Sequence, residues 1–229
     1  MGWFGRIITF WSRTFKANPK VINLNDEPLP DQCLLIGNHN AARGPVKYYA
    51  FLKKHIKKGH FMTWGAHPMC ESYIKRWKYL YYIFYRQKLG YRKFRSFILA
   101  TLFGAISGLI YKSAGIIPVY YDSRLRDTFK YTNKCLEQNV PVLIFPEDSS
   151  QGYRENVEKF SGGFLQASKA FYSKHEIDLP IYTIHYSQRN KNKIVIGKPM
   201  YYQELAKEHS KEEILQIFLD YMNQLKEIE

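Results

Sequence analysis

The chain has few cysteines, and they form no recognisable pattern. Cys33, Cys70 and Cys135 are odd in number and lack the close spacing of a metal-ligand cluster. Such a set argues against a disulfide scaffold and against a zinc site, and it fits a reducing cytoplasm. We therefore expect neither a metal nor a bound cofactor.

Low-complexity tracts, internal repeats and long hydrophobic runs are also lacking. Residues 97–111 form a stretch of 15 residues without a charge, short of the roughly 20 that a membrane-spanning helix needs. The stretch therefore predicts a buried or half-inserted helix. With 229 residues, of which 45% are hydrophobic, the chain is long enough for one domain with a substantial core.

Acidic residues are scarce relative to basic ones. The chain has 34 Lys and Arg against 20 Asp and Glu, a formal charge of +14, which favours an anionic partner. Residues 75–95 contain eight basic and eight aromatic side chains and no acid. A lipid surface or a nucleic-acid backbone fits such a segment, but no nucleic-acid-binding motif accompanies it. We expect an anionic phospholipid membrane and no nucleic acid.

The N-terminal segment does not have the pattern of a secretory signal, because Arg6 and Arg13 interrupt its apolar run. If residues 3–16 are helical, one side carries large apolar side chains and the other only basic charges. That pattern predicts an in-plane membrane anchor over residues 1–20, followed by a single domain over residues 21–229. The alternative is a helix packed on the core.

The remaining chain alternates between strand and helix patterns, which predicts an α/β fold. We expect one domain with a mixed, mainly parallel sheet flanked by helices. The C-terminal helix opens with a capping box of Ser210 and Glu213. The expected strands are residues 33–36, 61–64, 116–121, 140–145, 181–185 and 193–196, and the other expected helices are residues 45–54, 124–138 and 163–173.

Polar loops directly follow three of the expected strands. They are Asn38 and His39, residues 122–124, and residues 146–150. Ligands of open α/β sheets bind outside the carboxyl ends of the strands, so these loops are candidates for one site. A histidine in this position is alternatively a structural or surface residue.

At these loops the sequence resembles the lysophospholipid and glycerol-phosphate acyltransferases, relatives of bacterial 1-acylglycerol-3-phosphate acyltransferase. The resemblance covers about residues 34–199 and lies in the order of short motifs. They are Leu35-Ile36-Gly37-Asn38-His39, residues 115–121, Phe145-Pro146-Glu147, residues 159–164, residues 179–183 and residues 196–199.

Two departures from the family pattern concern residues that matter for chemistry. Gly44 stands where the family has the Asp that follows the catalytic histidine, and Asp148 begins the replacement of the Gly-Thr-Arg-Ser half of the third motif. The arginines that bind phosphate in the family are thus missing from their usual places, although Arg124 and Arg126 lie just beyond one of them.

The resemblance implies direct acyl transfer, with His39 as general base and acyl-CoA or acyl-carrier protein as the donor substrate. Glu147, or else Asp148, is the candidate to orient His39 in place of the missing Asp; alternatively, Glu147 only caps its own loop. The resemblance implies a hydroxyl of a lysophospholipid or related glycerolipid as the acceptor, at the cytoplasmic face of a membrane. The candidate substrate-binding residues are Asn38, Arg124, Arg126, Ser149, Ser150, Arg154, Lys159, Gly162 and Gly163.

A second hypothesis is a catalytically silent member of the same superfamily that binds membrane or lipid. Loss of the Asp and of two arginines fits relaxed catalytic demand, and it equally fits a changed acceptor. For Arg124, Arg126, Arg154 and Lys159 the alternative is an ordinary solvated surface charge.

Overall fold

The computed structural model describes residues 19–39, 43–148, 156–187 and 192–228. Seven strands in this part of the chain form one sheet in the order β1-β7-β6-β2-β5-β3-β4. Only β6 and β7 pair antiparallel, and the other neighbours are parallel. The strands are β1 (Lys20–Asn23), β2 (Leu34–Gly37), β3 (Met62–Ala66), β4 (Ile116–Val119), β5 (Val142–Ile144), β6 (Pro180–Ser187) and β7 (Lys193–Tyr201).

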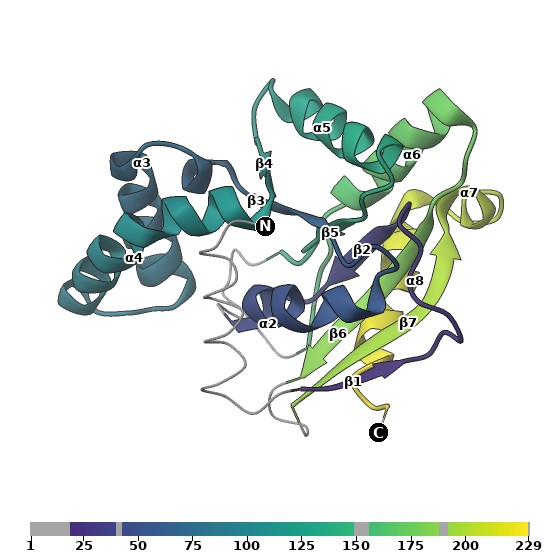
Figure 1. The fold of residues 1–229 in the computed structure, drawn as a ribbon, viewed down its shortest axis with the longest axis horizontal. Coiled ribbons are helices and arrows are strands. Elements are labelled where there is room, and N and C mark those ends of the chain that lie inside the picture. The colour runs from purple at the N-terminus through teal and green to yellow at the C-terminus, as the bar shows by residue number, and fades with distance from the viewer. Residues whose placement is uncertain (1–18, 40–42, 149–155, 188–191, 229) are drawn as a thin grey trace.

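Helices cover both faces of the sheet (Figure 1). One face packs on α2 (Arg43–Phe51) and the turn η1 (Leu52–His55), and the other packs on α5, α6 and α8. Their bounds are α5 (Leu125–Glu137), α6 (Gly163–His175), α7 (Tyr202–Leu205) and α8 (Lys211–Gln224). Beyond β3 and β4, a separate group is formed by η2 (His67–Cys70), α3 (Tyr73–Lys78), the π-helix η3 (Tyr79–Lys88) and α4 (Lys93–Ala114).

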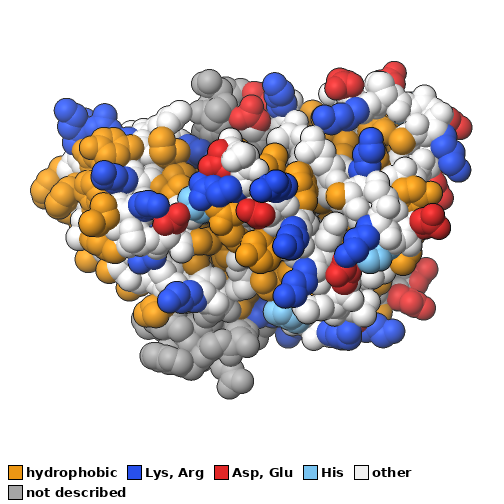
Figure 2. Space-filling model, turned by 90° about the horizontal axis from the view of Figure 1, so that it is seen from above, with side chains coloured by type: hydrophobic (Ala, Val, Ile, Leu, Met, Phe, Trp, Pro, Cys, Tyr) orange, Lys and Arg blue, Asp and Glu red, His pale blue; other side chains and the backbone are white. Residues whose placement is uncertain are grey.

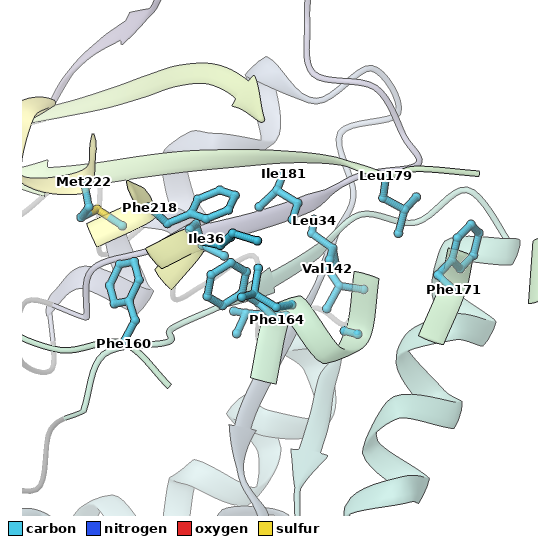
Figure 3. Close-up of a cluster of buried hydrophobic side chains, with 14 of the residues drawn as sticks. Leu34, Ile36, Val142, Phe160, Phe164, Phe171, Leu179, Ile181, Phe218 and Met222 are labelled. Atoms are coloured by element: carbon cyan, nitrogen blue, oxygen red, sulfur yellow. The ribbon is translucent and has the colours of Figure 1, made fainter. Parts of the chain in front are cut away.

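The main core lies between the sheet and α6 and α8, where Phe164, Phe171 and Phe218 are buried (Figure 3). The ring centroids of Phe164 and Phe218 are 5.1 Å apart, edge to face. Leu34 and Ile36 alternate with Leu35, so that β2 contributes to the cores on both faces. A strand buried on both faces explains its continuous apolar sequence.

The α/β prediction with a mixed, mainly parallel sheet is confirmed. Each expected strand and helix from residue 33 to residue 225 is present within a few residues of its predicted ends. The capping box of α8 is also present: Glu213 N–H donates to the Ser210 hydroxyl at 3.3 Å, and Ser210 N–H donates to Glu213 Oε2 at 2.7 Å. The N-terminal anchor helix lies outside the described residues.

The predicted helix over residues 97–111 is present within α4, but the alternative that it is buried is wrong, and the half-inserted alternative stays a prediction. Helix α4 contains a window, Lys93–Lys112, that is long and apolar enough to cross a membrane, and only 22% of that window is buried. Strand β1 and helix η3 were not predicted. Two of the three β1 side chains after Lys20 are apolar but β1 is short, and η3 lacks a clear apolar face, since its side chains are mostly Tyr, Phe and basic residues.

Candidate active site

Two turns meet at the carboxyl ends of the parallel strands, because β2 and β5 are neighbours in the sheet. Strands β2 and β5 run parallel, with Leu34 opposite Val142 and Ile36 opposite Ile144. The turn after β2 carries His39 and the turn after β5 carries Glu147. The backbone N–H of His39 donates a hydrogen bond to Glu147 Oε2 at 2.9 Å. The structure therefore brings these two candidate catalytic residues together.

The imidazole of His39 packs against an aromatic ring from the neighbouring turn. Its centroid lies 5.2 Å from that of Phe145, with 67° between the ring planes. Phe145 in turn contacts Tyr48 of α2, at 5.7 Å between centroids. His39 is half-buried, and its Nδ1 is shielded from solvent.

Asn38 directs its side chain inward and fastens the His39 turn to the sheet. Its Nδ2 donates to the carbonyl of Tyr186 at 3.0 Å, and its Oδ1 accepts from the Tyr186 N–H at 2.7 Å. The Tyr48 hydroxyl, which is buried, lies 2.6 Å from the same Oδ1. Each contact satisfies a polar group that is away from water. Asn38 was expected to bind substrate, and the contacts described for it are structural.

Burial raises the pKa of the Tyr48 phenol well above its ordinary value, and the nearby charge of Glu147 adds to the effect. Tyr48 is therefore a neutral hydrogen-bond donor at physiological pH. Its hydroxyl bonds to Asn38, and the ring lies within electrostatic range of Glu147.

The Glu147 turn is held by residues 159–161, which belong to the fourth of the short motifs that resemble the acyltransferases. Asp148 N–H donates to the carbonyl of Lys159 at 3.0 Å, and Ser161 N–H donates to that of Pro146 at 2.7 Å. Glu147 and Phe160 thereby form an isolated antiparallel bridge. Lys159 contributes its backbone to this contact, while its side chain is exposed.

Lys88 joins the site from the end of η3. Burial lowers the pKa of its ammonium group, and the carboxylates of Asp148 and Glu147 act in the opposite direction. Lys88 is half-buried and lies within electrostatic range of the two acids. Sequence reasoning missed Lys88 because nothing distinguished it from the other basic residues of the 75–95 segment; Tyr48 gave no signal at all.

The two arginines after β4 are not brought to His39. β4 is the edge strand, separated from β5 by β3, so its turn starts about 10 Å from the Glu147 turn. Arg124 is exposed and pairs with Asp122, with Nη2 to Oδ2 at 2.6 Å. That pairing lowers the pKa of Asp122 to about 2. Arg126 is likewise exposed, on α5.

Gly162 and Gly163 begin α6, where close packing requires small residues. A Cβ on Gly163 would lie 3.0 Å from the ring of Trp64, and one on Gly162 would lie 2.9 Å from the Lys211 side chain. Their observed role is packing. Ser149, Ser150 and Arg154 lie outside the described residues.

No protein-family model and no curated protein matches the chain. Among solved structures, it is similar to the 1-acyl-sn-glycerophosphate (LPA) acyltransferase PlsC from Thermotoga maritima, with 12% identity and a TM-score of 0.48. The match covers 99% of this chain and 78% of that chain. A similarity of this size does not bear on function, which has to be argued from the residues of the site.

Proposed function

We propose that the protein is an acyltransferase that moves a fatty acyl group from acyl-CoA or acyl-carrier protein to a hydroxyl of a lysophospholipid or related glycerolipid. His39 is the general base in this proposal. The observation that carries it is the hydrogen bond at 2.9 Å between the His39 backbone and the Glu147 carboxylate. It joins, at the carboxyl ends of β2 and β5, two of the motifs in which the sequence resembles the acyltransferases.

In the proposed reaction, His39 takes the proton of the acceptor hydroxyl as its oxygen attacks the thioester carbonyl. The new ester C–O bond forms and the C–S bond breaks, and the proton passes from the imidazolium to the thiolate that leaves. A base of this kind contributes about 10²–10⁴-fold to the rate. No covalent intermediate with the protein is needed.

Glu147 is a positioning residue in this scheme. Its carboxylate accepts from the backbone of His39 and lies near the buried Tyr48 and near Lys88. The cation of Lys88 offsets the charge of Glu147 and Asp148 where an anionic substrate would otherwise be repelled. We also assign Lys88 the contact with a substrate phosphate, because Arg124 and Arg126 follow the edge strand β4 and are exposed.

The general-base role is tested with His39→Ala and with acyl-CoA plus a panel of lysolipid acceptors. We expect turnover to fall by about 10²–10⁴-fold while circular dichroism and the melting temperature stay near those of the parent. His60→Ala is the matched control, since His60 is exposed and precedes the amino end of β3, at the opposite edge of the sheet. Undiminished turnover in His39→Ala would refute the assignment. Parent protein that binds lysolipid but transfers no acyl group to any acceptor would favour the catalytically silent hypothesis.

The role of Lys88 is tested by comparing lysophosphatidate with a phosphate-free monoacylglycerol as acceptor. Lys88→Gln should raise the KM for the phosphorylated acceptor at least about tenfold, as the loss of one charge-assisted contact predicts, and leave the other KM near its original value. Lys169→Gln on α6, which is exposed, serves as the control. Equal effects on both acceptors would contradict the phosphate contact and leave the His39 proposal untouched.

A further inference from the structure

Helix α4 is built with its large apolar side chains facing outward. The residues that it buries are small: Ser96, Ala100, Gly104 and Ser107. Phe94 is 76% exposed, Phe97 53%, Leu102 64%, Ile106 47% and Leu109 57%. A helix of a water-soluble domain shows the opposite arrangement, with the large apolar side chains against the core.

The face of α4 that carries small side chains lets α3 and η3 approach closely. A Cβ on Gly104 would already touch the Tyr73 ring at 3.4 Å, and one on Gly108 would lie 2.8 Å from the Arg76 guanidinium. Trp77 Nε1–H also donates to Thr101 Oγ1 at 3.0 Å. Small residues at spacings of four are how helices pack together in lipid, where the large side chains face the acyl chains. We call residues 73–114 the α3–α4 hairpin.

The apolar surface continues from α4 onto the other two helices. Ile74 of α3 is 64% exposed and Tyr82 of η3 is 58% exposed. Figure 2 shows hydrophobic side chains gathered at the end of the molecule that the hairpin forms, interspersed with Lys and Arg. Apolar side chains gathered in this way, with a polar rim, mark interaction sites.

The charged residues that the hairpin itself contributes are all basic, although Glu71 at its border pairs with Lys75. From residue 72 to residue 121 the sequence contains nine Lys and Arg and no Asp or Glu. Arg86 and Lys93 line an open hollow of about 560 Å³ together with Tyr81, Tyr82 and Gln87. Cations and tyrosine hydroxyls beside an apolar face match the order of phosphate headgroup and acyl chain in a bilayer.

We infer that the α3–α4 hairpin is a docking surface for an anionic phospholipid bilayer, with the exposed face of α4 lying in the plane of the membrane and the hollow taking a headgroup phosphate. A second copy of the chain fits less well, because it would bring two mainly basic rims together. A hairpin that spans the membrane is disfavoured, because its η3–α4 corner would have to pass through the hydrocarbon layer. Five basic residues surround that corner, and moving their charges into hydrocarbon is costly: Arg86, Lys88, Arg92, Lys93 and Arg95.

This inference extends the proposed function by naming the surface through which the protein meets the lipid, and its test requires no turnover. Failure of the docking surface and failure of the chemistry are therefore distinguishable. The test also has to be specific for the hairpin, because residues 1–20 are a second candidate for membrane binding.

A fluorophore on α4 makes the test specific for that surface. Leu102→Cys is labelled with an environment-sensitive nitrobenzoxadiazole in a Cys70→Ser, Cys135→Ser background. The remaining Cys33 is fully buried, and burial raises its thiol pKa, so it does not react. Vesicles of phosphatidylcholine and phosphatidylglycerol should raise the emission several-fold and shift it to shorter wavelength. A label at Ile177→Cys, exposed between α6 and β6, should not respond.

Flotation of the full chain with the same vesicles provides the second measurement. Leu102→Asn combined with Ile106→Asn should reduce the bound fraction by roughly tenfold or more, through lost apolar burial. Arg86→Gln combined with Lys93→Gln should remove the preference over vesicles of phosphatidylcholine alone. Ile177→Asn is the control for the first pair and Lys169→Gln for the second.

Three outcomes would overturn the inference. One is a label at position 102 that stays in water while the protein floats. Another is flotation unchanged in Leu102→Asn, Ile106→Asn. The third is absent vesicle binding together with a dimer that this double variant converts to a monomer, as measured by analytical ultracentrifugation.

Discussion

Helices α8 and α4 both carry large apolar side chains, but α8 turns them toward the core and α4 turns many of them toward the solvent. α8 buries Ile214, Phe218 and Met222 against the sheet and turns Glu212, Gln216 and Asp220 to the solvent. α4 buries Ser96, Ala100 and Gly104 and turns Phe94 and Leu102 outward. Both helices pack closely on their neighbours, but only α8 buries large apolar side chains fully, whereas Leu99 and Phe103 of α4 are half-buried against Leu80 and its neighbours.

The difference shows that the two helices obtain stability from different sources. Burial of apolar surface holds α8, at about 25 cal/mol per Å². Close backbone approach and side-chain hydrogen bonds such as Trp77 to Thr101 hold α4. Substitutions that are severe in one helix should consequently be mild in the other, and four variants test this contrast.

Phe218→Ala should have the largest effect. The side chain is fully buried between α8 and α6, and removal of such an aromatic ring costs about 3–5 kcal/mol. Chemical denaturation of the purified protein measures the loss, and Phe97→Ala on α4 is the matched control, with little change expected in water. Equal losses in the two variants would mean that α4 is stabilised by its exposed rings after all.

Gly104→Leu should rank second. The new side chain would extend from a position already in contact with Tyr73 and Leu80, and overpacking of this kind costs about 1–3 kcal/mol. Ala105→Leu, one residue further along and exposed, is the control and should change stability by less than about 0.5 kcal/mol. The opposite ranking would show that α4 tolerates bulk on its inner side.

Ser210→Ala should have an intermediate to small effect, on α8 alone. It removes the acceptor for the Glu213 N–H and costs about 1 kcal/mol, as loss of an N-cap does. Denaturation is compared with that of Ser173→Ala, an exposed serine whose hydroxyl donates to the Lys169 carbonyl of its own helix. A result no larger than the control would mean that the capping box adds nothing to the stability of α8.

Leu102→Asn should have the smallest effect on folding in water. Its side chain is mostly exposed, and substitutions at such positions usually stay within about 0.5 kcal/mol. Thermal melts without lipid provide the measurement. A loss of several kcal/mol would place Leu102 in a packed interface of the isolated protein and would contradict the comparison between α4 and α8.

Much of the fold could be predicted from local pattern. A few neighbouring residues are enough to predict some elements. Examples are the short apolar strand Leu34–Gly37, the amphipathic helix α5 and the capping box at Ser210. Strand order could not be predicted in this way, because pairing depends on contacts distant in sequence. The orientation of α4 was also hidden, since a helix that is apolar on most sides does not indicate which side is buried.

The candidate site was predictable to the extent that it lies on neighbouring strands. His39 and Glu147 meet because β2 pairs with β5, whereas Arg124 follows the edge strand β4 and pairs with Asp122. Asn38 illustrates another limit: the sequence shows a polar residue beside the histidine, but not that its amide bonds to Tyr186. Lys88 reaches the site through the crossover between β3 and β4, which no short motif describes.

The bond that joins the two turns has an implication for how such a site changes over time. Glu147 holds residue 39 by its main chain, and every amino acid except proline supplies that N–H. The imidazole can therefore be exchanged without releasing the turn, so that mutation could remove the chemistry proposed for His39 while the scaffold persists. Inactive descendants with an intact sheet edge are an expected product of this geometry.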